Sequence, residues 1–416
     1  MRLFFIFILI SFNLKAQENL GHMHGSHTEC ELPKTTMDVI RCAVRSNPEA
    51  QRAILATAQA STLPDAEGQF PNPELDVDIA NGKDNANSTE IGLLQKIQWG
   101  GKRSSKIDSA RAQVSLAEAM QNDVQADVIR ETVKNLYRLR QLEFEKSILN
   151  NTIQTLQKII SQQASRPTLP PEQQVTLSVY RMALADAKMK SAESLDEERE
   201  LEHFFHVSTG HSLLELKSIL PMAYENWPQI SNVDKINSDL KSPAMKKALA
   251  EKDLALAELS SARANTWPEL KLGAVMKKEE TDNNNETLYG FRLVMDLPFF
   301  SLNSGGRAYA SRGVERFEKG ADLTAREDSH ERIEQIKVYK SAIQSLNDAP
   351  AVQSIEKDFT RNQNLAQRGL ISGSLLIEFH RQRSELIRSR NLRELKAIQA
   401  LWHIRKIDGT IFSETL

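Results

Sequence analysis

Four short segments of the chain alternate apolar and polar residues, which is the pattern of a β-strand with one apolar and one polar face. In the first segment Leu75, Val77 and Ile79 alternate with acidic residues. Polar, turn-forming segments follow the first and the third strand, so we expect two β-hairpins. The four predicted strands cover residues 74–80, 89–99, 269–278 and 287–297.

The apolar faces of these strands supply candidate lipid-facing residues. The strands are about nine to eleven residues long, the length that a tilted transmembrane strand needs. Two aromatic residues lie near strand ends, where membrane barrels carry aromatic girdles. A half-buried sheet on a soluble core is the alternative interpretation. The candidate lipid-facing residues are Ile91, Leu93, Ile97, Trp99, Leu270, Leu272, Tyr289, Phe291 and Leu293.

Most of the remaining chain has the apolar spacing of very long helices. No proline occurs from residue 101 to about 165, and a run that starts with Ile107, Ala110 and Val114 follows the spacing of three or four residues that helices show. A continuous helix of this length would extend about 95 Å. Prolines then force a reversal, which predicts a helical hairpin over 101–208. A break at 347–350 and a glycine-rich turn at 369–373 predict a second hairpin over 305–408. A solvated structural coiled coil would show the same pattern.

The order of these elements repeats along the chain. Pro48 and Pro243 begin alanine-rich helices, and Pro-Glu-Leu triplets begin at Pro73 and Pro268, in both cases 195 positions apart. A Gly-Gly-basic motif follows the second strand of each copy. We therefore predict a tandem duplication. The expected division is a signal peptide (1–16), a His/Met-rich N-terminal tail (17–34), a first repeat (35–210), a linker or equatorial segment (211–241), a second repeat (242–409) and a C-terminal tail (410–416).

Composition and the N-terminus indicate an exported protein. With 40% hydrophobic and 26% charged residues the chain is neither disordered nor a polytopic helical membrane protein. The 53 Lys and Arg residues nearly balance the 55 Asp and Glu residues, so we expect no nucleic-acid partner. Arg2 precedes a short apolar run that ends before Ala16, which is typical of a secretory signal peptide.

Potential metal ligands gather near the mature N-terminus. Imidazole, thioether and thiolate groups form a ligand set suited to copper, zinc or related ions. A tail that captures an exported metal and a polar tail that is merely rich in histidine are both compatible with the pattern. Cys30 and Cys42 are the only cysteines, and a disulfide and two free thiols both remain open. The candidate ligands are His22, Met23, His24, His27 and Cys30.

No catalytic constellation is evident, so we expect neither an enzyme nor a cofactor. The Gly100-Gly101-Lys102 motif does not match a phosphate-binding loop, because Lys96 and Arg103 occupy the positions that need glycine and Ser or Thr. We interpret the carboxylates along the long helices as solvated faces. His203 and His206 are interpreted as polar residues at a helix end.

Several motifs in order resemble a known family. They are the duplicated Pro-Glu-Leu strand entry, the strand exit 98–103 with its partner 303–307, and the segment 369–378 with the sequence Gly-Leu-Ile-Ser-Gly-Ser-Leu-Leu-Ile-Glu. On these motifs the chain is similar, over nearly its whole mature length, to the TolC-like outer membrane efflux family. It is nearest to the heavy-metal branch typified by CzcC and CusC.

The resemblance implies a mainly α fold with a small transmembrane β part. Long antiparallel helical hairpins would form a periplasmic tunnel, and the four strands would join a twelve-stranded outer-membrane barrel in a homotrimer. Four strands cannot close a barrel, and an open sheet edge cannot face lipid, so membrane insertion requires oligomerisation.

The implied function is a passive exit duct in the outer membrane of a Gram-negative type envelope. An inner-membrane RND-type pump would deliver heavy-metal cations through a periplasmic adaptor protein. A channel for drugs or for type I protein secretion is an alternative, and so is a soluble periplasmic coiled-coil scaffold or adaptor.

By the same resemblance, the turns at the far ends of the helical hairpins contact the adaptor. Ordinary turn chemistry is the competing explanation, since glycine and serine form turns in many settings. Gly373 and Ser374 replace a bulkier and often acidic pair, so an acidic selectivity ring is not carried over. The candidate contact residues are Gly369, Leu370, Ile371, Ser372, Leu375, Leu169 and Pro170.

Overall fold

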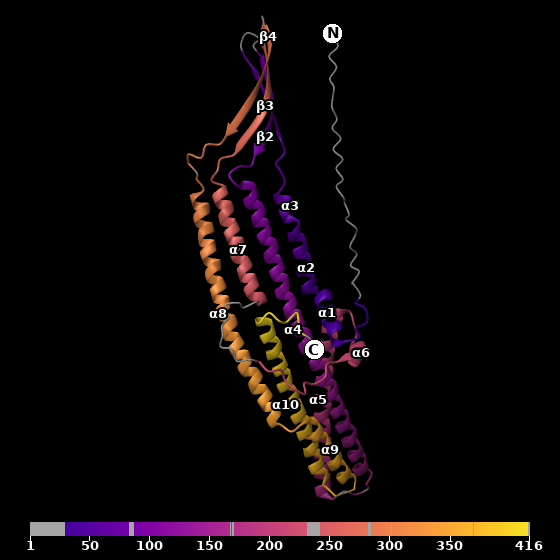
Figure 1. The fold of residues 1–416 in the computed structure, drawn as a ribbon. Coiled ribbons are helices and arrows are strands. Elements are labelled where there is room, and N and C mark those ends of the chain that lie inside the picture. Colours follow the sequence, from indigo (N-terminus) through magenta and orange to yellow (C-terminus); the bar gives the residue numbers. More distant parts are fainter. Residues whose placement is uncertain are drawn as a thin grey trace, which may run out of the picture.

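The molecule is elongated, with a small β-sheet at one end and long helices that run to the other (Figure 1). The computed structural model describes residues 30–414 except 83–86, 167, 169, 231–241, 282–283, 301 and 369. The long axis is set by α4, which is 63 residues long and therefore extends about 95 Å. The predicted fold class, mainly helical with a small β part, is confirmed.

The first half of the chain builds two strands and one long helical hairpin. A capping box between Thr35 and Asp38 begins the first helix, and Gly210, in the left-handed region with φ 77°, ends the last one. The elements are α1 (Thr36–Ser46), α2 (Pro48–Ser61), α3 (Leu63–Glu67), β1 (Glu74–Asn81), β2 (Asn87–Ile97), α4 (Lys102–Ala164) and α5 (Pro171–Thr209).

The second half repeats this plan with a break in the outgoing helix. Arg390 donates from Nη1 to the carbonyl oxygens of Leu346 (2.9 Å), Ala349 (3.3 Å) and Pro350 (3.1 Å), which satisfies the end of α8 at the break. The elements are α6 (Leu213–Leu216), η1 (Lys217–Ile219), α7 (Pro243–Ala264), β3 (Leu270–Thr281), β4 (Asn284–Met295), α8 (Ser304–Asp348), α9 (Val352–Gln367) and α10 (Gly373–Ile407).

The two halves share one antiparallel sheet with the strand order β1-β2-β3-β4. Within the sheet, the halves meet at the β2–β3 pair, in which Leu93 lies opposite Ala274. Strands β1 and β4 are the edges of the sheet. Each edge presents unpaired backbone groups to whatever lies beside it.

The largest hydrophobic cluster lies at the middle of the molecule, where α1, α4, α5, α6 and α10 meet. Its largest fully buried side chains include Trp402, Phe205 and Leu136. The described part of the expected linker, residues 211–230, packs onto this region. Tyr224 stacks on Tyr137 with ring centroids 5.9 Å apart, so the segment bridges helices rather than connecting them loosely.

Candidate functional site

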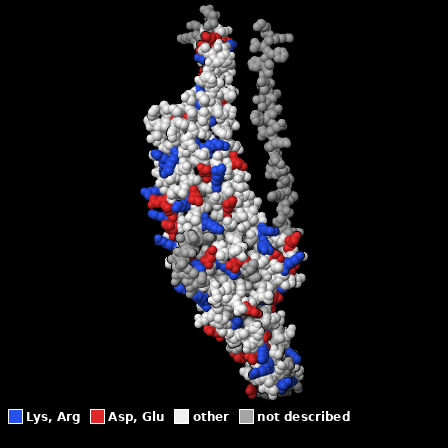
Figure 2. Space-filling model, in the orientation of Figure 1, with Lys and Arg blue, Asp and Glu red and all other residues white. Residues whose placement is uncertain are grey.

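One face of the sheet is apolar across all four strands. The pairing register aligns Leu75 with Leu93, Leu93 with Ala274 and Ala274 with Phe291, so the apolar positions of neighbouring strands share a face. Phe291 is 90% exposed and Tyr289 80% exposed. Figure 2 shows the strand region as largely uncharged, with charged residues at its tip. The apolar face also includes Val77, Ile79, Ile91, Ile97, Leu270, Leu272, Met276, Leu293 and Met295.

The opposite face of the same sheet is charged. Lys271 Nζ lies 2.5 Å from Glu74 Oε2, and Lys96 Nζ lies 2.6 Å from Glu269 Oε2. Arg292 of β4 forms ion pairs with Asp76 of β1 and with Glu90 of β2. A sheet with one apolar and one charged face matches the wall of a membrane barrel, whose polar side faces the lumen.

The reach of Arg292 shows that the sheet curls toward its charged face. Strands β1 and β4 are three strand spacings apart, about 14 Å in a flat sheet, which two extended side chains barely span. The ion pair between Arg292 and Asp76 therefore closes across a concave surface. Gly273 lies opposite Arg292, and a Cβ atom there would meet Leu93 O at 2.0 Å, so β2 and β3 approach closely at this point.

Trp99 lies outside the strands, contrary to the sequence-based boundary. Strand β2 ends at Ile97, and Gly100 and Gly101 have φ angles of 65° and 79°, which begin the turn into α4. The Trp99 indole donates to Pro268 O (2.7 Å), and its ring lies 5.1 Å from that of Trp267. Trp99 is half-buried against Trp267, so the prediction that it lies on a lipid-facing strand is wrong.

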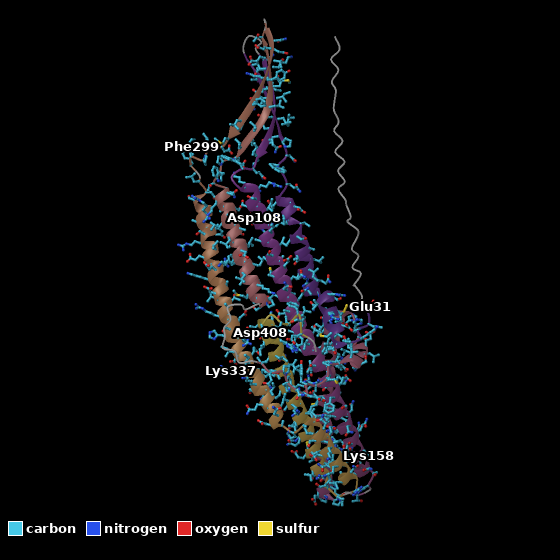
Figure 3. The ribbon with its side chains drawn as sticks, viewed as in Figure 1. Glu31, Asp108, Lys158, Phe299, Lys337 and Asp408 are labelled. Carbon is cyan, nitrogen blue, oxygen red and sulfur yellow. A yellow bond between two sulfur atoms is a disulfide. The ribbon has the colours of Figure 1, made fainter. Side chains whose placement is uncertain are left out.

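Aromatic residues at the junction of strands and helices are highly exposed. Phe299 and Phe300 follow β4, and both project from the protein surface. Figure 3 shows Phe299 at the level where the sheet gives way to the helices. This level is where an aromatic girdle is expected beneath a membrane-spanning band.

The turns between α4 and α5 and between α9 and α10 lie together at the end of the molecule opposite the sheet (Figure 1). Leu370 is 67% exposed there, and Leu375 and Pro170 are also exposed, whereas Ile371 is half-buried. Ser372 caps α10 by accepting from Leu375 N (3.3 Å). The predicted contact residues Gly369 and Leu169 lie outside the described residues.

Gly373 at this end has no room for a side chain. A Cβ atom at this position would lie 1.7 Å from the Tyr180 hydroxyl of α5. Tyr180 is itself buried, and burial raises the pKa of its phenol. The absence of a side chain at Gly373 therefore permits a close contact between the two helical hairpins.

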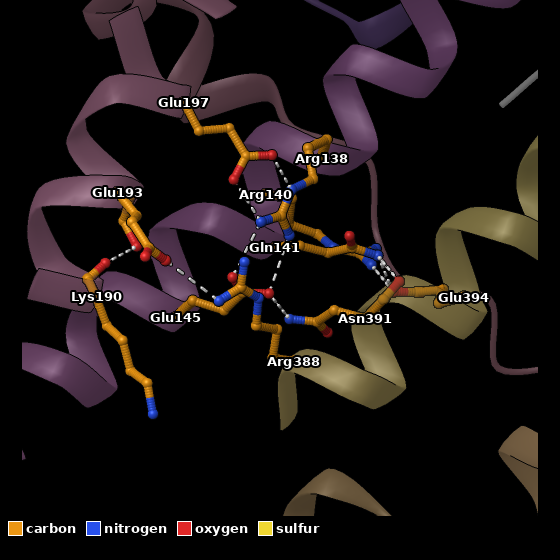
Figure 4. A network of polar contacts seen from close by, with 11 residues as sticks. Arg138, Arg140, Gln141, Glu145, Lys190, Glu193, Glu197, Arg388, Asn391 and Glu394 are labelled. Carbon is orange, nitrogen blue, oxygen red and sulfur yellow. Dashed lines mark hydrogen bonds and ion pairs between the residues drawn. The ribbon is translucent and has the colours of Figure 1, made fainter. Parts of the chain in front are cut away.

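A buried polar network joins α4, α5 and α10 (Figure 4). Arg138 donates to both oxygens of Glu145 (2.9 and 3.1 Å) and to both oxygens of Glu197 (2.5 and 2.7 Å). Asn391 of α10 donates to Glu145 (2.7 Å), and Gln141 donates to the Asn391 carbonyl (3.0 Å). Burial alone would lower the pKa of Arg138, but its hydrogen bonds to Glu197 and Glu145 raise that pKa above its ordinary value.

This network corrects the interpretation of the helical carboxylates as solvated faces. Glu145 is 8% exposed and is fully engaged with Arg138 and Asn391. The helical period indicated only that positions 138 and 145, two turns apart, lie on the same face of the helix. The partner positions on α5 and α10 follow from tertiary packing, which no local pattern encodes.

A buried histidine lies in the same helical region. Thr152 donates its hydroxyl to Ile148 O (2.9 Å), so its oxygen accepts from His380 Nδ1–H (2.9 Å). His380 Nε2 then carries the lone pair and has no hydrogen-bond partner among the described residues. Burial, with a contribution from the Arg383 charge, lowers the pKa of His380 to about 4, so the ring is neutral near pH 7.

The proposed metal-ligand set falls almost entirely outside the described residues, which exclude His22, Met23, His24 and His27. Cys30 is described, and it forms a disulfide with Cys42, which settles the pairing that the sequence left open. The disulfide removes Cys30 from the ligand set in the oxidised protein, because its sulfur is no longer a thiolate. Within the described part of the chain, no cluster of three or more His, Cys, Asp or Glu side chains is arranged to hold a metal.

Among the described residues, no helix has the length and apolar character that crossing a bilayer requires.

Comparison of the sequence with known proteins finds a distant relative. No family model matches the sequence. The cobalt-zinc-cadmium resistance protein CzcC of Cupriavidus metallidurans is 21% identical over 270 residues, which cover 62% of this chain. The match spans 63% of the length of that relative.

Solved outer-membrane channels resemble the chain over most of its length. The Campylobacter jejuni CmeC outer membrane channel has a TM-score of 0.71 at 13% identity, with 91% of this chain and 86% of CmeC covered. The channel-forming protein CusC has a TM-score of 0.64 at 15% identity, with coverages of 89% and 92%.

The outer membrane protein VceC of Vibrio cholerae has a TM-score of 0.65 at 13% identity, with coverages of 90% and 96%. The chain therefore has the fold of these outer-membrane proteins, and the fold-level resemblance inferred from its motifs is confirmed. By their names, these proteins are a resistance protein and membrane channels.

Proposed function

We propose that the chain is the outer-membrane channel component of a tripartite efflux system. The observation that carries this proposal is the sheet, which is apolar on one face, charged on the other and curled toward the charged face. The apolar positions from Tyr289 on β4 to Leu297, two residues beyond the end of that strand, extend about 27 Å in an extended backbone, or about 21 Å along the membrane normal at a tilt of about 40°. This is close to the height of about 25 Å of the apolar band of outer-membrane barrels.

Closure of the barrel requires other copies of the chain. The edges β1 and β4 cannot face lipid with their backbone groups unpaired, and four strands are too few to close. Three copies would supply twelve strands and leave no edge. The helices would then form a periplasmic tunnel, and a homotrimer is the functional unit.

The test is membrane fractionation followed by electrophoresis without boiling. We expect detergent-dependent extraction from the outer membrane and a trimer band that collapses to a monomer on heating. A soluble periplasmic monomer would support the alternative of a coiled-coil scaffold and overturn this proposal.

The exposed hairpin ends are proposed to contact a periplasmic adaptor protein, through which an inner-membrane RND-type pump delivers substrate. The support is the pair of exposed leucines, Leu370 and Leu375, at the end opposite the sheet. Leu370→Asp should abolish crosslinking to the adaptor and leave the amount of trimer unchanged. Leu214→Asp, at an exposed leucine of α6, is the matched control and should crosslink normally. Normal crosslinking of the Leu370 variant would contradict the proposed contact.

Heavy-metal cations are the proposed substrates. The support is the similarity to a cobalt-zinc-cadmium resistance protein and the histidine-rich N-terminal segment. A strain that lacks the chain should lose more of its tolerance to metal salts than of its tolerance to antibiotics. Deleting residues 21–29 should reduce metal binding and metal tolerance, and unchanged values for both would reject a role for the tail.

A further inference from the structure

The charged face of the sheet carries more acidic than basic residues. The pairing register assigns six carboxylates and four basic groups of the strands to this face, an excess of two acids per chain. The acids are Glu74, Asp76, Asp78, Glu90, Glu279 and Glu286, and the bases are Lys96, Lys271, Lys277 and Arg292.

Arg292 differs from the three lysines in where it lies and in how many acids it holds. Its side chain reaches from edge strand β4 across the concave face to Asp76 of the other edge strand and to Glu90 of β2. The Arg292 side chain is 29% exposed and the Glu90 side chain 21% exposed, so the ion pair is partly shielded and still in contact with solvent. Gly273 lies opposite Arg292 in the register and leaves the space over β3 free of a side chain.

The geometry points to Arg292 as the residue that sets the charge selectivity of the pore, an inference that rests on the proposed channel function. In a closed barrel the concave face lines the lumen, and the Arg292 charge offsets part of the negative charge of Asp76 and Glu90. The wall then attracts cations weakly. Without Arg292, both carboxylates act on passing ions uncompensated.

The expected size follows from the distance between wall and ion. Three charges, one from each chain, at about 10 Å from the pore axis and screened by 0.1 M salt, change the local cation concentration by a factor of about two. Because screening shortens to about 3 Å at 1 M salt, the effect should nearly vanish there. Salt dependence thus separates a charge effect from a change of pore shape.

The test is the reversal potential of the purified trimer in a planar phosphatidylcholine bilayer under a KCl gradient. Arg292→Gln should raise the ratio of potassium to chloride permeability about twofold or more at 0.1 M salt. The double variant Asp76→Asn, Glu90→Gln should lower the ratio, because it leaves Arg292 as the uncompensated charge. Lys278→Gln is the matched control, since Lys278 lies on the other face near the strand tip and should leave the ratio unchanged.

The outcomes separate the two proposals. A wild-type trimer that forms no pore contradicts the channel function itself. A conducting trimer in which Arg292→Gln behaves like Lys278→Gln overturns the role of Arg292, as does a shift of both charge variants in the same direction. If Arg292→Gln fails to insert, the double variant decides alone, and an unchanged or increased cation preference in it counts against the inference.

Discussion

Removing the buried cation of the α4–α5–α10 network should loosen the helical half of the molecule. In Arg138→Met, the apolar stem of the side chain is retained while Glu145 loses its bidentate partner and stays buried. Removing one member of a buried ion pair typically costs about 3–5 kcal/mol, because the remaining charge has no compensation. The matched control is Arg199→Met, whose pair with Asp196 is mostly exposed and should cost at most about 0.5 kcal/mol.

Hydrogen exchange read by mass spectrometry measures the local stability of these helices. Since each 1.4 kcal/mol is a factor of about ten, the amides of residues 134–149 should exchange about 100- to 4000-fold faster in Arg138→Met when opening is rapid and reversible. The control should change their rates by less than about threefold. Equal rates in the two variants would refute the view that the network holds these helices together.

Three further predictions concern single positions. The unfolding free energy of the wild type should fall by up to about 3 kcal/mol between pH 6.5 and pH 4, because unfolded His380 takes up a proton near pH 6.5 and folded His380 only near pH 4. In acid denaturation curves His380→Gln should remove this fall, and an identical fall in the variant would rule out His380 as its source. Gly373→Ala should weaken contact between the hairpin ends and speed proteolysis there, because the added Cβ would clash with the Tyr180 hydroxyl. Tyr180→Phe should partly rescue this variant, and no rescue would argue against the clash. Gly273→Ala should reduce the yield of heat-sensitive trimer, since its Cβ would collide with the backbone of β2, and a normal yield would show that the strands tolerate separation.

The strands and long helices were predictable because their signals are local. Alternation over Leu75, Val77 and Ile79 indicates a two-faced strand, and the helix that begins after Gly101 shows its period with an interruption at Gln121 and has no proline before residue 167. The break before α9 was predictable for the same reason, because Pro350 stands within it. Strand ends were less predictable, since the end of β2 before Trp99 depends on a contact with Trp267, far away in the chain.

The charged face of the sheet was only partly predictable from the sequence. Alternation places Asp76, Glu90 and Arg292 on polar faces of their own strands, but it does not say which strands are neighbours or that the sheet curls. The Arg138 network was missed for a similar reason. Its acids come from two helices, and a charged residue on a long helix has the same local pattern whether it is buried or solvated.

The central claim, that the strands of three chains close one barrel, is tested most directly by crosslinking the sheet edges of neighbouring chains. Cysteines would replace Val77 on β1 and, in separate variants, Phe291, Leu293 or Met295 on β4, all on the apolar face. Oxidation in the membrane should produce covalent dimers and trimers for at least one pair and nothing larger, because a closed ring of three has no free edge. A ladder that continues beyond three chains, or monomers for every pair, would contradict the account.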